Sequence, residues 1–375
     1  MLTVSDVSLR FSDRKLFDDV NIKFTEGNTY GLIGANGAGK STFLKILAGD
    51  IEPTTGHISL GPNERLSVLR QNHFDYEEER VIDVVIMGNE RLYDIMKEKD
   101  AIYMKEDFSD EDGVRAAELE GEFAELGGWE AESEASQLLQ NLNIPEDLHY
   151  QNMSELTNGD KVKVLLAKAL FGKPDVLLLD EPTNYLDAEH IDWLKRYLQN
   201  YENAFVLISH DIPFLNDVIN IVYHVENQQL TRYSGDYYQF QEVYAMKRSQ
   251  LEAAYERQQK EIADLKDFVA RNKARVATRN MAMSRQKKLD KMDIIELQSE
   301  KPKPSFDFKP ARTPGRFIFQ AKDLQIGYDR PLTKPLNLTF ERNQKVAIIG
   351  ANGIGKTTLL KSLLGIIPPI AGEVE

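Results

Sequence analysis

The 375-residue sequence contains no cysteine, which excludes disulfide bridges and thiolate chemistry. It also lacks any apolar run approaching the roughly 18 to 20 residues that a membrane-spanning helix needs. The opening residues, MLTVSDVSLRF, have neither the basic nor the apolar region of a secretory signal. The six histidines show no metal-ligand spacing; they are His57, His73, His149, His190, His210 and His224. We therefore expect a cytoplasmic protein that spans no membrane and has no histidine metal site.

Positive charge is too scarce for a uniformly basic nucleic-acid-binding surface, because 46 Lys and Arg face 60 Asp and Glu, a net charge of −14. The imbalance is local, since residues 75–134 contain 21 acidic and 6 basic side chains. Residues 271–291 carry the opposite excess, a net of +7, with Asp290 as their one acidic residue. Such blocks are typical of interaction surfaces or solvated faces.

An internal repeat divides the chain. TYGLIGANGAGKSTFLKILAGDIEPTTGHI, from Thr29, aligns without a gap to KVAIIGANGIGKTTLLKSLLGIIPPIAGEV, from Lys345, at a constant offset of 316 residues. The first copy has room to be complete. The second begins near Phe317, and before Glu375 we expect in it only a strand, a phosphate loop, a helix and the start of another strand.

The region between the copies predicts a helical hairpin. Apolar residues recur there at three-, four- and seven-residue steps, in a stretch without Gly or Pro: Tyr244, Leu251, Tyr255, Ile262, Leu265 and Val269. A second stripe follows with Leu289, Met292 and Ile295, and the prolines of KPKPSF end it. The basic turn is expected near Val276–Met283. A solvated, charge-rich linker is the alternative.

The acidic block predicts a helical insertion in the first copy, at about residues 85–135. Its apolar residues have helical spacing: Leu92, Ile95, Met96 and Ile102, then Ala117, Leu119, Phe123 and Leu126. The segment SDEDG, at Ser109–Gly113, is expected to separate the helices.

Two phosphate-binding loops follow from the repeat. GANGAGKS lies between an apolar strand and a helical run, as a P-loop requires, and GANGIGKT repeats that context, which argues against a chance glycine-rich turn. Backbone N–H groups would face the phosphates of ATP, the lysine would add a charge, and the last hydroxyl would face Mg²⁺. The expected ATP-binding residues are Gly34, Asn36, Gly37, Gly39, Lys40, Ser41 and Thr42, with Gly350, Asn352, Gly353, Gly355, Lys356, Thr357 and Thr358 in the second copy.

Hydrolytic residues are expected at two strand ends. VLLLDEP places Asp180 to hold Mg²⁺ through water and Glu181 to polarise the attacking water. FVLISHD ends a second buried strand at His210, which could contact the γ phosphate or orient Glu181. Gln71, after the segment SVLR, is a further candidate for sensing Mg²⁺ and the attacking water. The alternatives are that Asp180 and Glu181 are acidic loop residues without a catalytic role and that His210 is an ordinary surface or core histidine.

GANGAGKS, LTNGD at Leu156–Asp160, LLLDEPTNYLD and LISHD together resemble the nucleotide-binding domains of ABC ATPases. EPTNYLD, two such domains, a helical linker and YSGDYYQF are similar to the ABC-F subfamily, and the resemblance covers essentially the whole chain. It implies an α/β P-loop NTPase fold, an ABC domain with a helical insertion, a helical-hairpin linker and the start of a second ABC domain. The expected boundaries are 1–242, 243–312 and 313–375.

The resemblance also assigns roles across a pair of ABC domains. The signature helix of one domain caps the ATP of the other, so Thr157, Asn158 and Gly159 would face the nucleotide at Lys356. Phe11 and Tyr328 match the aromatic that stacks on adenine, with strand core as the alternative, and Asp187 matches the residue that contacts the facing domain.

Three departures from the family pattern stand out. LTNGD replaces LSGGQ or LSGGE; Asn158 stands for a glycine, and because asparagine tolerates left-handed backbone the loop can still form. Tyr185 stands where the family has histidine. The second copy stops before a signature, Walker B carboxylates or a switch histidine, so the Lys40 site has no signature in cis and the Lys356 site has no general base.

ABC-F proteins act on ribosomes, and their linker reaches towards tRNA. The resemblance therefore implies that rRNA and tRNA are partners of the linker tip, which Arg271, Lys273, Arg275 and Arg279 would contact. ATP-driven domain closure would modulate translation. The open alternatives are ribosome protection against antibiotics, an ATPase subunit of an ABC transporter, and a module that only binds ATP.

Overall fold

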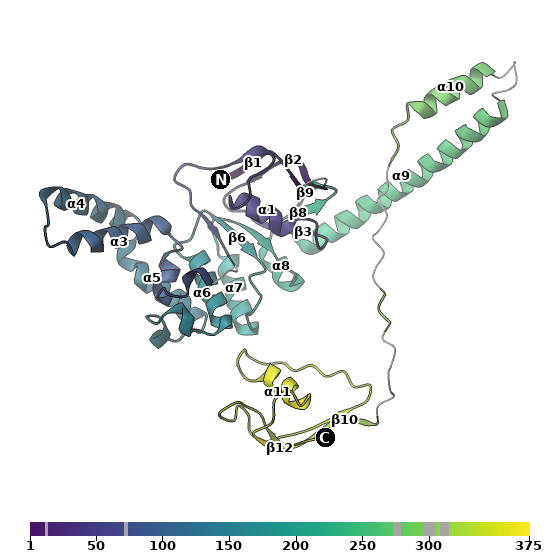
Figure 1. Ribbon diagram of the computed structural model, residues 1–375. Helices are drawn as coiled ribbons and strands as arrows, with labels where there is room; N and C mark the ends of the chain where they lie inside the picture. Colours follow the sequence, from purple (N-terminus) through teal and green to yellow (C-terminus); the bar gives the residue numbers. More distant parts are fainter. Residues whose placement is uncertain (12–13, 71–73, 273–278, 296–304, 308–314) are drawn as a thin grey trace. The chain divides into compact units, whose positions relative to one another are not determined.

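A computed structural model describes residues 1–11, 14–70, 74–272, 279–295, 305–307 and 315–375 (Figure 1). The chain separates into two compact units. The first consists of Met1–Tyr237 with Pro314–Glu375, and the second of Tyr238–Thr313.

A six-stranded sheet forms the centre of the first unit, with the order β5-β6-β7-β3-β8-β9. Its strands are β3 (Thr29–Gly34), β5 (Leu66–Val68), β6 (Val176–Asp180), β7 (Ala204–Ile208), β8 (Ile221–Glu226) and β9 (Gln229–Ser234). The first five strands in that order pair in parallel, and β9 pairs antiparallel with β8. Because β6 and β7 are central strands in a parallel sheet, their apolar runs VLLL and AFVLI are buried on both faces.

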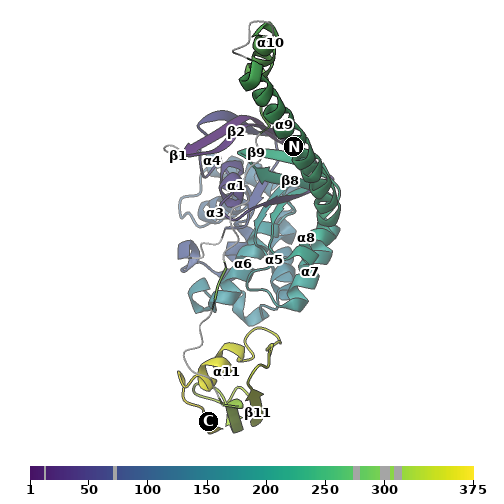
Figure 2. The same cartoon turned by 90° about the vertical axis from the view of Figure 1, so that its right-hand side faces the viewer.

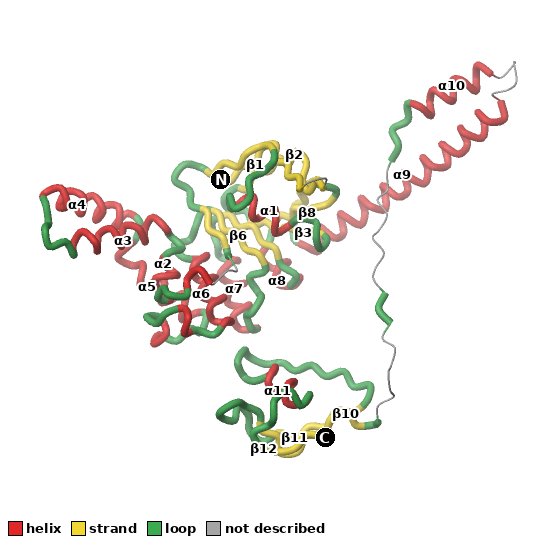
Figure 3. The backbone as a smooth tube through the Cα atoms, viewed as in Figure 1, coloured by secondary structure: helices red, strands yellow, loops and turns green. Residues whose placement is uncertain are grey.

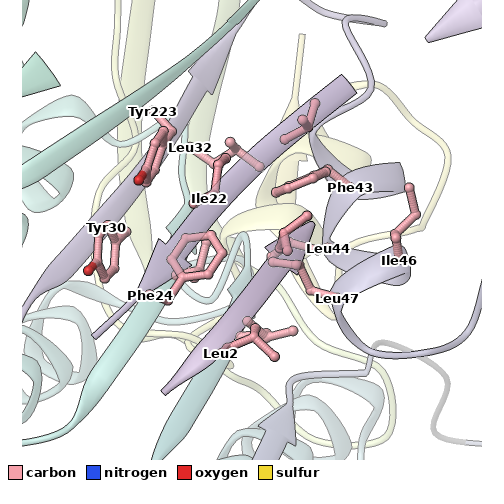
Figure 4. Packing of buried hydrophobic residues seen from close by; sticks show 14 of the residues in the cluster. Leu2, Ile22, Phe24, Tyr30, Leu32, Phe43, Leu44, Ile46, Leu47 and Tyr223 are labelled. Carbon is pink, nitrogen blue, oxygen red and sulfur yellow. The ribbon is translucent and has the colours of Figure 1, made fainter. Parts of the chain in front are cut away.

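A smaller antiparallel sheet packs with the helix that follows the first phosphate loop. It has the order β2-β1-β4, from β1 (Leu2–Phe11), β2 (Arg14–Phe24) and β4 (Thr55–Leu60). Phe43, Leu44, Ile46 and Leu47 of α1 (Lys40–Leu47) share one buried cluster with residues of both sheets (Figure 4). This cluster fixes the start of α1, and hence the phosphate loop, between the two sheets.

The acidic block is helical, as expected. The helices of this region are α2 (Val81–Ile86), α3 (Glu90–Tyr103), α4 (Asp110–Glu125), α5 (Ala131–Asn141) and α6 (Asn158–Leu170), and α7 (Ala188–Gln199) and α8 (Ile212–Val218) follow. In Figure 3, α3 and α4 extend side by side from the body of this domain, and Figure 2 gives the orthogonal view. The expected break between two helices is present, but it lies at residues 104–109 and not at Ser109–Gly113, because Ser109 and Asp112 form a capping box that starts α4 at Asp110.

The second copy contains β10 (Phe317–Gln325), β11 (Leu336–Glu341), α11 (Lys356–Leu363) and β12 (Ala371–Val374), with the sheet order β11-β10-β12. The expectation of a strand directly before its phosphate loop was wrong, since residues 345–350 pair with no strand in the described chain. The counterpart β3 is held between β7 and β8, which the 375 residues do not repeat. Val346 is consequently 56% exposed, whereas its counterpart Tyr30 is 2% exposed.

The second unit is built on two helices, α9 (Tyr237–Asn272) and α10 (Arg279–Asp290). The turn was expected as far as Met283, but α10 has already begun at Arg279, so residues 279–283 are helical. Met292 and Ile295 were expected in the second helix and instead follow its end. The Ile295 N–H donates to Gln258 Oε1 at 2.8 Å, and Gln258 Nε2 donates to the Asp293 carbonyl at 2.7 Å, which pins this segment to α9.

Within the part of the chain that the structure describes, no helix has the length and apolarity needed to span a membrane.

Candidate nucleotide site

The first phosphate loop curls between β3 and α1 and holds its own lysine. Lys40 Nζ donates to the carbonyl oxygens of Gly34, at 2.8 Å, and Ala35, at 3.3 Å. Burial lowers the pKa of Lys40, and the nearby carboxylates of Glu181 and Asp180 oppose that shift. The ammonium group thus lies over the loop, beside the carboxyl end of β6, where a polyphosphate would replace the carbonyls as its partner.

Gly39 shapes the turn into α1. It is the N-cap residue and has φ +102°, a left-handed conformation that a side chain disfavours. A Cβ atom there would lie 2.8 Å from Phe17 Cζ, and Phe17 is fully buried against Phe43 with 5.3 Å between ring centroids. The core of the small sheet therefore reaches the underside of the phosphate loop. Ser41 and Thr42 follow in the first turn of α1.

Asp180 and Glu181 lie where β6 ends, as the sequence predicts. Glu181 has φ +51°, and its N–H donates to the Ile208 carbonyl at 2.9 Å, which turns its side chain away from the strand direction. Its Oε2 accepts the His210 N–H at 3.1 Å. Its Oε1 is buried without a hydrogen-bond partner in the described structure, 3.5 Å from His210 Nε2. A buried carboxylate oxygen of this kind can accept a proton from water.

The oxygen donors for Mg²⁺ fit a nucleotide-dependent site. Among the described residues, no group of three His, Asp or Glu side chains forms a complete metal cage. Mg²⁺ usually takes only one or two protein oxygens and completes its shell with phosphates and water. Ser41 at the start of α1 and Asp180 at the end of β6 provide such oxygens. Thr357, expected to bind Mg²⁺ in the second copy, lies in the first turn of α11. Gln71, which was also expected to bind Mg²⁺, lies outside the described residues.

The signature segment forms the start of α6. Thr157 is the N-cap residue: its Oγ1 accepts the Asp160 N–H at 3.3 Å and donates to Asp160 Oδ2 at 2.7 Å. The segment forms although Asn158 replaces a glycine, but tolerance of left-handed backbone is not the reason. Asn158 is the first residue of a right-handed helix, and neither it nor Gly159 has a positive φ. The asparagine is tolerated because the helix, not a glycine turn, sets its backbone.

Asp187 caps α7 and also contacts the second phosphate loop, within the first unit. Its Oδ1 accepts from the His190 N–H at 3.2 Å and from His190 Nδ1 at 2.5 Å, and its Oδ2 accepts the Asn352 N–H at 3.4 Å. Asn352 Nδ2 also donates to the Tyr185 carbonyl at 2.8 Å. Burial raises the pKa of Asp187, but the hydrogen bonds from His190 and Asn352 outweigh it, and the pKa is lowered.

The second phosphate loop repeats the first. Lys356 Nζ donates to the carbonyls of Gly350, at 2.8 Å, and Ala351, at 2.6 Å, and Gly355 is the N-cap residue with φ +98°. Gly353 has φ +81°, and Thr357 and Thr358 follow in α11. The two aromatic candidates for adenine stacking are exposed, Phe11 at 50% and Tyr328 at 63%, so the alternative that they are strand core was wrong.

The cationic tip is only partly within the described residues. Lys273 and Arg275 lie outside them. Arg271 Nη2 pairs with Asp267 at 2.9 Å, and Arg279 begins α10 and is exposed. The guanidinium of Arg285 lies 3.6 Å from the centroid of the Phe268 ring.

Two residues beside the site were missed by the sequence reasoning. Arg14 Nη2 donates to the Gly37 carbonyl in the first phosphate loop, at 3.0 Å. His190 is 3% exposed and holds Asp187. A signal for His190 was its i,i+3 spacing from Asp187 at the start of a helix, which places the two side chains on one face.

Comparison with known proteins gives two family matches. A model described as ABC transporter matches residues 17–184 and 333–375, and a second model with the same description, for an extension of such chains, matches residues 223–308. Together these regions include the phosphate loops, the strand β6 that ends in the Walker B carboxylate Asp180, and most of the helical linker.

Similar proteins extend over the full chain. It is 54% identical over 385 residues to the uncharacterized ABC transporter ATP-binding protein YfmM of Bacillus subtilis, with 100% of this chain and 73% of that protein covered. It is 42% identical over 377 residues to the probable ATP-binding protein YbiT of Escherichia coli O157:H7, with 100% and 71% covered. A solved ATP binding subunit of an ABC transporter matches at 22% identity and a TM-score of 0.47, covering 62% of this chain and 90% of that one.

Proposed function

Because the chain belongs to the ABC family of ATPases and carries the linker of its ABC-F type, we propose that it hydrolyses Mg·ATP and uses the accompanying domain closure to modulate translation on the ribosome. ABC domains bind ATP and pair with one another. The proposal adds the hydrolytic roles, the metal and the ribosomal partner.

The hydrolytic roles rest on the ends of β6 and β7. Glu181 would act as the general base, since its Oε1 is buried without a partner while Oε2 is held by the His210 N–H. His210, whose side chain is 68% exposed, would turn towards the γ phosphate. Lys40 would bind the β and γ phosphates, and Ser41 and Asp180 would hold Mg²⁺, which supplies charge neutralisation for phosphoryl transfer when bound.

The signature and the exposed aromatics would complete the nucleotide contacts. Phe11 and Tyr328 are free to stack on adenine because half or more of each side chain is exposed. Thr157 is the signature hydroxyl, and its hydrogen bond to Asp160 must break or bifurcate before it can donate to a γ phosphate. Asp187, at the start of α7, would contact the second phosphate loop through Asn352.

The observation that carries the ribosomal role is a cationic helical hairpin inserted between two ABC segments. The α9 helix is 36 residues long. Described cations at its far end, on α10 and directly after α10 include Arg271, Arg279, Arg285, Lys287, Lys288 and Lys291. Arginine suits both phosphate contacts and stacking on unpaired bases. Some of these cations pair with acidic residues of α9, for example Lys288 with Glu261 at 2.6 Å. The pair of Lys288 with Glu261 joins α9 and α10 and leaves a net positive charge.

Cosedimentation with ribosomes at graded salt tests this role. Changing Arg271, Lys273, Arg275 and Arg279 together to Glu should weaken binding and flatten its salt dependence, because the log-log slope falls by about 0.7 to 0.9 for every phosphate that is no longer neutralised. The control reverses four cations on the shaft of α9, namely Lys247, Arg248, Arg257 and Lys260, with the same change in net charge. Equal binding by wild type and tip variant would refute the tip as the RNA-binding element.

A second candidate, the ATPase subunit of a transporter, is favoured by the description of YfmM as an ABC transporter ATP-binding protein. Fractionation of cells distinguishes the two. Recovery of the tagged chain with membranes, and not with ribosomes, would support the transporter function.

A further inference from the structure

The start of β2 carries an arginine against the first phosphate loop. Arg14 is the first residue of β2, is exposed, and donates through Nη2 to the Gly37 carbonyl at 3.0 Å. Its neighbour Lys15 is engaged differently, in an ion pair with Asp18 at 2.5 Å. One cation of this pair therefore contacts the phosphate loop, and the other pairs with an acidic residue of its own strand.

Lys40 makes the same kind of hydrogen bond to the first phosphate loop as Arg14 does. Both Lys40 and Arg14 donate to carbonyl oxygens of the same loop, Lys40 to Gly34 and Ala35 and Arg14 to Gly37. A neutral carbonyl is a weaker partner for a cation than a phosphate oxygen, because charge-assisted hydrogen bonds are roughly twice as strong as neutral ones. A polyphosphate in the loop would therefore compete with these carbonyls for both side chains.

The internal repeat preserves this arginine. At the offset of 316, Asp13-Arg14 corresponds to Asp329-Arg330, and Leu16 corresponds to Leu332. The neighbouring Lys15 and Phe17 become Pro331 and Thr333. Because Arg14 and Arg330 are both exposed, packing in the core does not explain why both copies keep arginine.

The segment that follows the arginine has the same place in both copies. Beneath the first phosphate loop, Phe17 Cζ lies 2.8 Å from the position that a Cβ atom added to Gly39 would occupy. Beneath the second, Leu332 Cδ1 lies 3.5 Å from the position of a Cβ on Gly355. The segment thus runs under the start of α1 and of α11. In the first copy, where the contact is seen, the arginine at its beginning reaches the Gly37 carbonyl of the loop.

We propose that Arg14 and Arg330 are nucleotide-binding residues, each contacting the polyphosphate of the nucleotide at its own phosphate loop as a second cation beside Lys40 or Lys356. The guanidinium has five N–H donors in a planar fork, so one can stay on the Gly37 carbonyl while others bind phosphate oxygens. This inference rests on the ATP binding of the proposed function and adds the ligand group that these residues recognise.

The test isolates one site at a time. In a Lys356→Ala background, which leaves the first site intact, Arg14→Gln is compared with Lys15→Gln, a control that removes one charge from the adjacent position. Dissociation constants are measured calorimetrically for ATP, ADP and adenosine. We expect Arg14→Gln to weaken ATP and ADP about tenfold, as for the removal of one charge-assisted hydrogen bond. Adenosine binding should be unchanged, and Lys15→Gln should stay within twofold throughout.

The second site provides the reciprocal measurement, Arg330→Gln against Lys334→Gln in a Lys40→Ala background. An unchanged ATP affinity in Arg14→Gln would overturn the inference. So would an equal loss of adenosine binding, or a lowered unfolding temperature without nucleotide, since either would mean that Arg14 only supports the loop. If the Lys356→Ala parent binds no ATP, ATP binding at the first site itself fails, and the inference fails with it.

Discussion

Replacing Gly39 by alanine tests how the core beneath the phosphate loop constrains the site. Gly39 has φ +102°, and an added methyl group would approach within 2.8 Å of Phe17 Cζ and 3.5 Å of two further ring carbons. Phe17 has no room to retreat, because it is 0% exposed and packs on Phe43. The substitution therefore imposes both backbone strain and a steric collision.

The two costs can be estimated separately. A non-glycine residue held in a left-handed conformation costs about 1 to 3 kcal/mol. Forcing an extra methyl group into a packed core adds about 1 to 3 kcal/mol. The Gly39→Ala variant should therefore lose about 2 to 6 kcal/mol in the free energy of unfolding of the first domain. The upper part of that range is comparable to the whole stability of many domains, about 5 to 15 kcal/mol.

Urea unfolding without nucleotide, followed by circular dichroism, measures this loss, with Gly37→Ala as the matched control. Gly37 is in the same loop at φ +76°, but a Cβ there meets no atom within 4 Å, so only the backbone strain applies. Gly49→Ala, at φ +78° and equally open, repeats the control outside the loop. An equal fall in the urea midpoint for Gly39→Ala and Gly37→Ala would refute the steric part of the reasoning.

Lys40→Ala and Lys356→Ala should each lower the stoichiometry or affinity of Mg·ATP binding in calorimetric titrations, and two unaffected titrations would contradict the two-site interpretation. Glu181→Gln should slow ATP hydrolysis by about 10² to 10⁴ while ATP binding is retained, because it removes the base and keeps the shape; full turnover would rule Glu181 out as the base. Arg65→Met should lower the free energy of unfolding by about 2 to 4 kcal/mol, because the carbonyls of Gly88 and Phe171, each 2.8 Å from the guanidinium, lose their hydrogen-bond donor. The control Arg70→Met breaks only an exposed ion pair with Asp50 and should change the free energy of unfolding by less than about 1 kcal/mol.

Short sequence patterns were sufficient to predict those elements whose structure depends only on residues close to one another in the chain. The phosphate loops, the apolar strand before Asp180 and the 36-residue α9 were predictable because each depends on a short pattern of glycines, apolar runs or helical spacing. The family resemblance joined these elements into one fold. It also assigned Thr157 and Asp187, whose side chains cap α6 and α7.

Features that depend on distant partners could not be predicted in this way. Residues 345–350 read as a strand, but a strand needs neighbours, and only the first copy supplies them through β7 and β8. His210 was expected either to contact the γ phosphate or to orient Glu181, but the geometry of its contact with Glu181 depends on the register of β6 and β7, which no local pattern shows. Arg14 was missed because its contact with the Gly37 carbonyl depends on how the start of β2 returns beneath the phosphate loop.

The uninterrupted α9 helix has a mechanical consequence. With 36 residues and no proline or glycine, it is a rod of about 54 Å at about 1.5 Å per residue. Without proline or glycine it has no residue of the kind that kinks helices sharply, so a rotation at one end is carried to the other. By the same geometry, a rotation of about 10° at the base would sweep the far end through roughly 9 Å. Any rotation of α9 about its base is thereby converted, at its far end, into a displacement comparable to the width of a helix.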